Sequence, residues 1–207
     1  MEEMKSSDQA EKTKKHFDSI ASTYSDSSDG RFCESAYKPI LRELGQYKLG
    51  KWLDVSCGTG TVLSILKDSP LEKYGVDFSE KMIEEARRNV GDDVRLYVAS
   101  AEEMPFDKET FDVVTCSFAF HHYVRPAAVL RELRRIMKPE ATLIIVDPYL
   151  PLPLRLLINP LLRFSNHGDY HMYGQRELER MMRVNDFIME DFVRVGQRVF
   201  FSHNKAR

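Results

Sequence analysis

The sequence predicts an α/β fold built on a mainly parallel sheet, in a chain of 207 residues that suffices for one domain. Short apolar runs alternate with helical patterns along the middle of the chain, as in strands joined by crossover helices. A glycine-rich loop lies where the first of these strands meets its helix. The content of 43% hydrophobic and 30% charged residues is ordinary for a folded soluble protein and excludes disordered, collagen-like and membrane-spanning classes.

The expected elements follow in chain order. Two helices, 8–24 and 31–47, precede the first strand, and the second helix has Phe32, Ala36, Ile40 and Leu44 at helical spacing. Five strands and three further helices are then expected, the strands at 51–55, 73–77, 94–99, 111–117 and 142–147 and the helices at 61–67, 80–89 and 127–138.

Capping and breaking residues give the boundaries of the last two helices. Ser79 precedes the helix at 80–89, and Pro126 lies in the first turn of the helix at 127–138. Gly91 and Pro139 mark the ends of these two helices.

The C-terminal third begins with a segment rich in leucine and proline, 148–164. It is too short and too interrupted by proline to span a bilayer, which takes about 20 apolar residues. A lid, a wall of the substrate pocket, a contact with a membrane surface or a protein, and an extension packed on the sheet remain open as its role. A helix at 175–183 and strands at 187–195 and 198–203 follow, and Gly196-Gln197 between the strands predicts a terminal hairpin.

Charge and cysteine content limit the partners and the compartment. The 30 basic and 32 acidic residues leave a net charge of -2, so nucleic acid is not expected as the partner. Three cysteines form no disulfide framework, and the polar N-terminus has no apolar stretch typical of a secretory signal. We expect a cytoplasmic protein; the sequence does not define its oligomeric state.

The sharpest motif is LDVSCGTG, residues 53–60, in which Gly58 and Gly60 allow the backbone to approach a ligand. A dinucleotide-binding loop would need a third glycine where this chain has Leu63, which weakens the interpretation as a nicotinamide-dependent reductase. Asp77 ends the next strand, 23 residues after Asp54, near the spacing of a ribose-binding acid. The alternatives are a tight turn without a ligand and an Asp77 that only caps the following helix.

Taken in order, the segments LDVSCGTG, YGVDFSEKMIEEAR, ASAEEMPF, FDVVTCSFAFHH and LRELRRIMKPEATLIIVD resemble the small-molecule branch of the class I S-adenosylmethionine-dependent methyltransferases. The resemblance covers residues 50–147 and implies a Rossmann-like, seven-stranded, mainly parallel sheet with a reversed last strand and helices on both faces. It also implies S-adenosylmethionine as the cofactor and S-adenosylhomocysteine as the product.

The resemblance also assigns roles to individual residues. Those expected to hold the methionine part of the cofactor are Asp54, Ser56, Gly58 and Gly60, with Ser117 near its amino group. Asp77 is expected to hold the ribose, and the residues expected around the adenine are Phe78, Met82, Ala101 and Glu102. The segment HFDSIASTY is similar to the opening of quinone C-methyltransferase-like members, in which Tyr24 would close over the cofactor. The chain departs from the family at Ser100, where an acid is common, and at Ser56-Cys57, where glycines are.

These assignments divide one domain, 1–207, into four parts: an N-terminal helical lid (1–47), the cofactor-binding core (50–147), a substrate-side insertion (148–173) and a C-terminal helix with a hairpin (174–207). His121 and His122 follow the fourth strand, where the resemblance places the acceptor, and either could act as a base. Adjacent residues do not face one point, so one of the two is expected to line the pocket; a helix-cap or packing pair is the alternative.

We therefore expect methyl transfer by in-line displacement to a small hydrophobic or aromatic acceptor, without a metal. A catalytically silent S-adenosylmethionine-binding module that regulates or scaffolds a partner is the alternative. His167 and His171, with Asp169 between them, have a spacing that could bind a metal on a helix, but Gly168 favours a polar loop.

Overall fold

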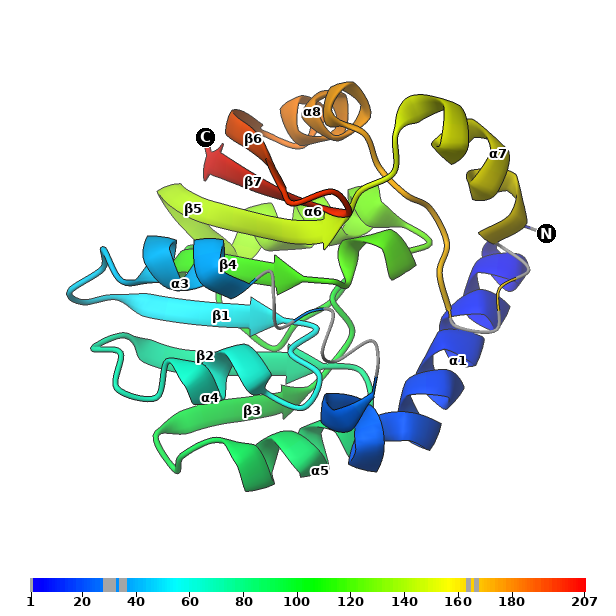
Figure 1. Cartoon of the computed structure of the whole chain (residues 1–207). Helices are drawn as coiled ribbons and strands as arrows, with labels where there is room; N and C mark the ends of the chain where they lie inside the picture. The colour runs from blue at the N-terminus through cyan, green and yellow to red at the C-terminus, as the bar shows by residue number, and fades with distance from the viewer. Residues whose placement is uncertain (1, 28–32, 34–36, 163–164, 166–167) are drawn as a thin grey trace.

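The computed structural model describes residues 2–27, 33, 37–162, 165 and 168–207, and its centre is one seven-stranded sheet (Figure 1). The strand order is β3-β2-β1-β4-β5-β7-β6. Strands β1 to β5 run parallel to one another, and β7 runs antiparallel to both β5 and β6. The expected sheet with a reversed last strand is confirmed. The strand bounds are Lys51–Val55 (β1), Glu72–Asp77 (β2), Val94–Val98 (β3), Phe111–Ser117 (β4), Met137–Pro148 (β5), Phe187–Val195 (β6) and Val199–Ala206 (β7).

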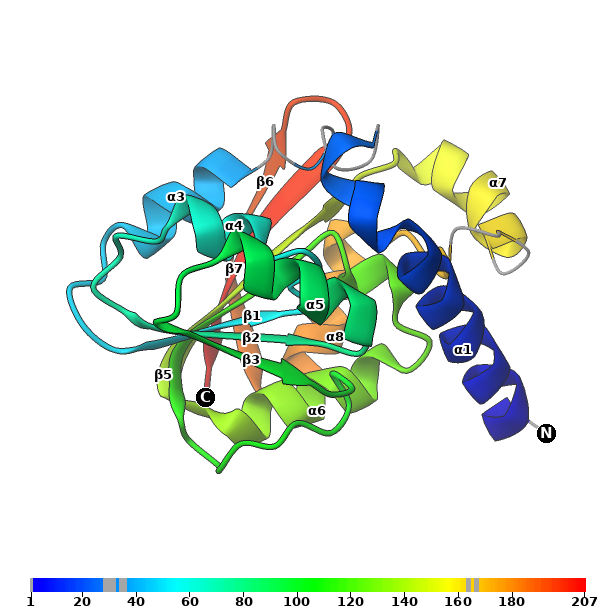
Figure 2. The ribbon, with the colours of Figure 1, turned by 90° about the horizontal axis from the view of Figure 1, so that it is seen from below.

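Helices cover both faces of the sheet (Figure 2). Side chains of α3 (Tyr37–Leu44), α4 (Thr61–Ile65) and α5 (Glu80–Asn89) pack into one apolar core. Side chains of α6 (Pro126–Ile136) and α8 (Gln175–Val184) pack into a second core on the opposite face. The sheet lies between the two cores because its central strands bury residues on both sides, as parallel strands do.

The observed helix boundaries test whether the capping residues in the sequence mark the starts of helices. The hydroxyl of Ser79 accepts a hydrogen bond from the backbone N–H of Met82 and caps α5, and Pro126 lies in the first turn of α6, both as expected. The second N-terminal helix ends earlier than predicted, since α3 ends at Leu44 rather than at residue 47; Phe32 and Ala36 lie outside the described residues.

The predicted helix end at Pro139 is wrong. Helix α6 ends at Ile136, and β5 begins at once and passes through Pro139. The pairing of β5 with β4 moves from Met137–Phe111 directly to Thr142–Val113, so an irregularity separates the two pairs. Because proline cannot donate to a strand ladder, it fits in such an interruption.

The N-terminal helices lie across the edge of the sheet where the parallel strands end (Figure 1). Helix α1 (Glu2–Ile20) leads into the 3₁₀ helix η1 (Ala21–Asp26), and both contact α5. The predicted helix 8–24 therefore starts earlier and changes type at Ala21.

The leucine-rich segment forms a helix, α7 (Leu152–Leu162), none of whose residues is buried. Pro153 falls in the first turn, where a helix needs no backbone N–H, whereas Pro160 lies inside the helix and removes one of its backbone hydrogen bonds near the C-terminal end. Among the described helices, none combines the length and apolar character that a bilayer crossing requires.

Candidate active site

A cavity of about 340 Å³ opens at the carboxyl ends of β1, β2 and β4. Its walls are the loops that follow these strands, together with α1 and η1. Most of the sequence-predicted site residues line it, namely Tyr24, Asp54, Ser56, Gly58, Asp77, Phe78, Met82, Ala101, Glu102, Ser117 and His122. Gly60 and His121 are the predicted residues that do not.

The two glycines of the first loop have different surroundings. Gly58 has φ +53°, and a Cβ built there would meet nothing within 4 Å, so its backbone faces open space. Gly60 has φ +75°, and its Cβ would lie 2.8 Å from Val90 Cγ1 and 3.2 Å from Ala86 Cβ. Gly60 therefore allows the start of α4 to pack against α5, whereas Gly58 borders the cavity.

A buried chain of hydrogen bonds holds Asp54 at the end of β1. Trp52 Nε1 donates to Thr115 Oγ1 over 2.9 Å, and Thr115 Oγ1 donates to Asp54 Oδ1 over 2.6 Å. Asp54 is 2% exposed, and burial raises its pKa to about 7 against the opposing effect of Thr115. These hydrogen bonds thus hold the carboxyl in a fixed orientation, and a cationic ligand beside it would stabilise its ionised form.

Asp77 joins the glycine loop to the start of α5. Its Oδ2 accepts from the Gly58 N–H and its Oδ1 from the Ser79 N–H, both over 2.9 Å. Burial raises its pKa to about 6 despite these hydrogen bonds. Asp77 therefore has a structural role, but Ser79 rather than Asp77 is the helix cap, and the Asp77 carboxylate retains acceptor capacity for a ligand.

Two further hydroxyls lie at the floor of the cavity. The Oγ of Ser117 is buried and has no hydrogen-bond partner among the described residues. Ser56 Oγ lies 2.8 Å from the hydroxyl of Tyr123, which also lines the cavity. On the opposite side, Glu102 is paired with Arg125. A buried hydroxyl without a partner indicates that a polar ligand group belongs beside Ser117.

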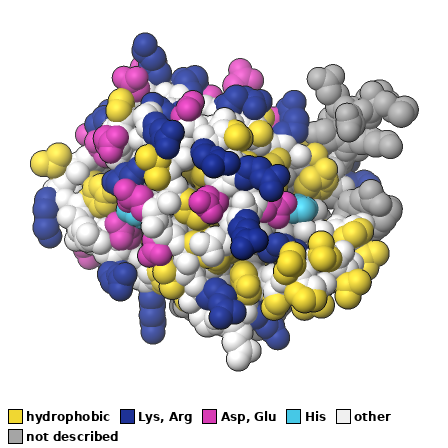
Figure 3. Space-filling view, turned by 90° about the horizontal axis from the view of Figure 1, so that it is seen from above, with side chains coloured by type: hydrophobic (Ala, Val, Ile, Leu, Met, Phe, Trp, Pro, Cys, Tyr) yellow, Lys and Arg dark blue, Asp and Glu magenta, His cyan; other side chains and the backbone are white. Residues whose placement is uncertain are grey.

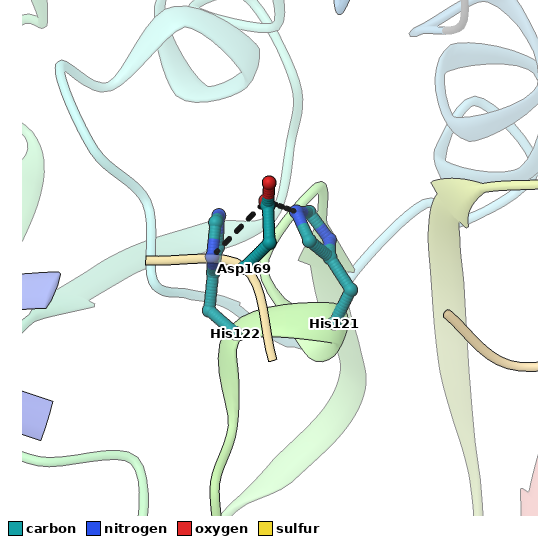
Figure 4. A group of neighbouring side chains, drawn as sticks. All are labelled: His121, His122 and Asp169. Carbon is teal, nitrogen blue, oxygen red and sulfur yellow. Dashed lines mark ion pairs between the residues drawn. The ribbon is translucent and has the colours of Figure 1, made fainter. Parts of the chain in front are cut away.

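His121 and His122 meet Asp169 beneath the cavity (Figure 4). His121 Nδ1 lies 2.9 Å from Asp147 Oδ1, and His121 Nε2 lies 3.3 Å from Asp169 Oδ1. His122 Nδ1 is 3.8 Å from the same Asp169 oxygen. The backbone carbonyl of His121 accepts from the N–H groups of Tyr170 and His171, which fixes the loop that carries Asp169.

The two histidines differ in protonation. Burial acts to lower the pKa of His121, but Asp147 and Asp169 together raise it to about 9, so its ring is protonated at neutral pH. Burial and the neighbouring charge of His121 lower the pKa of His122 well below its ordinary value. His122, the one that lines the cavity, is therefore a neutral imidazole.

The sequence interpretation placed an N-terminal helical lid over the cofactor but did not single out the residues of α1 that line the cavity. Ala10, Thr13 and Phe17 line the cavity, and Phe17 makes an edge contact with His122, with ring centroids 5.2 Å apart. Their spacing of three and four residues on one helix was the available signal. Tyr123, which directly follows the fourth motif, and Asp169 were also missed as site residues.

Of the roles left open for residues 148–164, that of a pocket wall does not fit the geometry. None of residues 148–162 lines the cavity, so α7 is not a pocket wall. His171 bonds to Glu177 over 2.8 Å, and His167 lies outside the described residues. In the part of the chain that the structure describes, the group with metal-ligand geometry is instead the cluster of His121, His122 and Asp169, whose donor atoms lie within 4.8 Å of one another.

Comparisons with known proteins agree on the family. A family model described as "Methyltransferase domain" matches residues 53–145. A demethylmenaquinone methyltransferase of Staphylococcus aureus (strain JH9) is 32% identical over 176 residues, 73% of each chain. The chain belongs to the class I S-adenosylmethionine-dependent methyltransferases. In fold, this methyltransferase resembles the YcgJ protein of Bacillus subtilis (TM-score 0.72, 18% identity, 84% of this chain and 99% of that one). It also resembles a methyltransferase of Aquifex aeolicus (TM-score 0.67, 22% identity, 82% and 89%).

The methyltransferase uses S-adenosylmethionine as its cofactor, and its cavity fits that molecule on three observations. The Gly58 backbone borders open space. The buried Ser117 hydroxyl has no hydrogen-bond partner among the described residues. Two buried carboxyls, Asp54 and Asp77, have raised pKa values, which a cationic ligand and ribose hydroxyls would lower again.

Proposed function

We propose that this enzyme transfers a methyl group from S-adenosylmethionine to a small hydrophobic or aromatic acceptor, such as a quinone-like ring, by in-line displacement. The observation that carries the proposal is the position of His122, which lines the same cavity as Gly58 and Asp77 and lies against the ring of Phe17. An aromatic wall beside a neutral imidazole suits an aromatic acceptor with a hydroxyl group. The relative in Staphylococcus aureus is named for a quinone-type acceptor.

The cofactor would be held by the residues that line the loop end of the cavity. Asp54, Ser56, Gly58 and Ser117 would hold the methionine part, with Gly60 supporting the loop from outside, and Asp77 would accept from the ribose hydroxyls. Phe78, Met82, Ala101 and Glu102 would surround the adenine. When bound, S-adenosylmethionine supplies a methyl carbon on a cationic sulfur, and the acceptor–carbon bond forms as the carbon–sulfur bond breaks with its electron pair left on sulfur.

His122 would then take the proton that the acceptor loses. Methyl transfer moves the positive charge of the sulfonium onto the acceptor, which makes that proton strongly acidic. A neutral imidazole of low pKa therefore suffices as the base, and it is unprotonated and ready at neutral pH. His121 would act as a positioning residue, because its ion pairs with Asp147 and Asp169 hold the Asp169 carboxylate beside His122.

The N-terminal segment would close the site. Tyr24 and Phe17 line the cavity, and their rings contact each other with centroids 6.1 Å apart. Removing water from the reacting atoms strengthens alignment and charge stabilisation in an in-line displacement. The three free, buried cysteines support a reducing, cytoplasmic setting. No feature of the described residues supports the alternative of a catalytically silent module.

Turnover with an aromatic acceptor tests the proposal. The purified chain would be incubated with S-adenosylmethionine and a water-soluble demethylated quinol, with the formation of S-adenosylhomocysteine and of the methylated product as the readouts. The proposal is supported if the wild type forms product and if Asp77→Ala abolishes both product formation and the calorimetric binding of S-adenosylmethionine. Cofactor binding without turnover of any phenolic or quinol acceptor would overturn the choice of acceptor and favour the silent module.

A further inference from the structure

Both polar residues of helix α7 lie on its inward side. The residues of α7 that are partly covered are Arg155, Ile158, Asn159 and Leu162, which recur at helical spacing. Two of them, Arg155 and Asn159, are the polar residues of an otherwise apolar helix. The leucines of the opposite side are largely exposed: Leu152 (57%), Leu154 (45%), Leu156 (66%), Leu157 (70%) and Leu161 (65%). Surface helices of soluble proteins show the reverse pattern.

Specific contacts fix this orientation. The side-chain amide of Asn159 donates to the Met172 carbonyl over 3.1 Å and accepts from the Met172 N–H over 3.0 Å. The guanidinium of Arg155 lies against Gly174, so closely that a Cβ at Gly174 would fall 1.9 Å from Arg155 Nη1. The leucines therefore face outward because polar side chains anchor the helix, and a rotation that buried them would break these contacts.

A basic rim adjoins the leucines. Leu152 borders a shallow hollow that is lined by Arg155, Arg176, Arg180 and Arg194. The acidic residue in this hollow, Glu177, is paired with His171 over 2.8 Å, while Glu179 of the same helix does not line it. The sequence from 148 to 168 contains no Asp or Glu. Figure 3 shows the apolar patch with Lys and Arg side chains beside it.

We propose that α7 docks this methyltransferase on an anionic membrane surface, with its exposed leucines in the lipid interface and the arginines of the rim against lipid phosphates. An apolar helix face bordered by cationic side chains is the pattern of helices that lie in the membrane interface. A second copy of the chain fits less well, because a two-fold interface through α7 would bring the basic rim of one copy against that of the other. The inference rests on the proposed function in one respect, since a hydrophobic acceptor would reach the site from the bilayer.

Vesicle co-sedimentation of the full chain, without cofactor or acceptor, tests this proposal. We expect binding to vesicles of phosphatidylglycerol with phosphatidylcholine and little binding to phosphatidylcholine alone. The double variant Leu156→Ser/Leu157→Ser should bind at least about tenfold more weakly, because each leucine loses its burial in lipid. Arg176→Gln/Arg180→Gln should weaken binding and reduce its sensitivity to salt. Leu49→Ser is the matched control, since Leu49 is an 80% exposed leucine outside α7.

Two further measurements keep the outcomes distinct. Sedimentation velocity reports the oligomeric state, and a dimer that dissociates in Leu156→Ser/Leu157→Ser, with no vesicle binding by the wild type, would overturn the proposal in favour of a second copy. Equal binding of wild type and double variant to anionic vesicles would also overturn it. Calorimetry with S-adenosylmethionine and turnover of a water-soluble acceptor should be unchanged in the double variant, so failure of membrane docking can be separated from failure of the proposed function.

Discussion

The hydroxyl of Ser79 donates a hydrogen bond to the carboxylate of Asp18, which ties α1 to the capped start of α5. Lys14, one turn earlier in α1, pairs with the same carboxylate over 3.1 Å. Because Asp77 accepts from the Ser79 N–H, this contact connects the helix that covers the cavity to the acid expected to hold the ribose. The position of the lid and the geometry of the cofactor site are thus coupled through one serine.

We predict that Asp18→Ala weakens S-adenosylmethionine binding about fivefold, because a lost hydrogen bond of about 1 kcal/mol loosens α1 over the cavity. Asp18→Asn, which can still accept from Ser79, should have a smaller effect. Calorimetric titration measures both. Glu11→Ala removes an exposed ion pair of the same helix and is the control; an equal loss in that variant would mean that helix content, not the contact with Ser79, matters.

Cofactor affinity should rise with pH between about pH 5 and pH 8. The pKa of Asp54 is raised to about 7 and that of Asp77 to about 6, both by burial, so both carboxyls are largely protonated at the acidic end. A cationic cofactor binds the ionised carboxylates better, and binding therefore releases protons. Calorimetry in buffers of different ionisation enthalpy measures this release. Asp54→Asn should flatten the upper part of the profile; an unchanged profile would contradict the role of Asp54.

The two loop glycines should respond differently to alanine. At Gly58 the added methyl meets no protein atom, so Gly58→Ala should weaken cofactor binding and cost only about 1 kcal/mol of folding stability for its positive φ. At Gly60 the methyl would overlap Val90, so Gly60→Ala should lower stability by about 2 to 3 kcal/mol. Urea unfolding and calorimetry separate the two effects, and similar values for both variants would contradict the assignment.

The ion pairs of His121 should make stability depend on pH. The folded-state pKa of about 9 lies above the ordinary 6.5, so the contribution is complete below about pH 6.5 and is lost as the pH rises through about 9. Asp147→Asn should cost about 3 kcal/mol, since it leaves a buried imidazolium without its nearest carboxylate. It should also remove most of this dependence. Thermal unfolding from about pH 6 to pH 10 measures it; a wild type that gains stability toward pH 9 would rule out the protonated His121.

Replacing His122 should impair turnover without impairing cofactor binding. We expect His122→Gln to lower kcat about a hundredfold, because the acceptor loses its base, with the affinity for S-adenosylmethionine unchanged. His171→Gln, outside the cavity, is the control. Chelators should not lower the rate, since a metal at the cluster of His121, His122 and Asp169 would have to compete with the proton of His121. A chelator-sensitive rate would instead identify that cluster as a metal centre.

Much of the fold and half of the site could be predicted from the sequence, because the signals for these parts lie within short segments of the chain. The alternation of apolar runs and helical patterns predicts the order of strands and helices along the chain, because each short element shows the hydrophobic period of its own type. Asp54 and Asp77 can be placed together because parallel strands end at one edge of a sheet. Ser79 identifies the start of α5 through the side chain it must present to the backbone.

What only the tertiary structure decided is which distant or adjacent side chains face the same space. Phe17 reaches the cavity, and Asp169 reaches the side chains of His121 and His122, from segments far from the glycine loop, and no periodicity relates them to it. The sequence could not say which of His121 and His122 lines the pocket, since the choice depends on the partner Asp147 on β5. It also could not show that α7 exposes its leucines. The polar contacts of Asn159 with Met172 turn the helix outward, and such contacts exist only once the chain has folded.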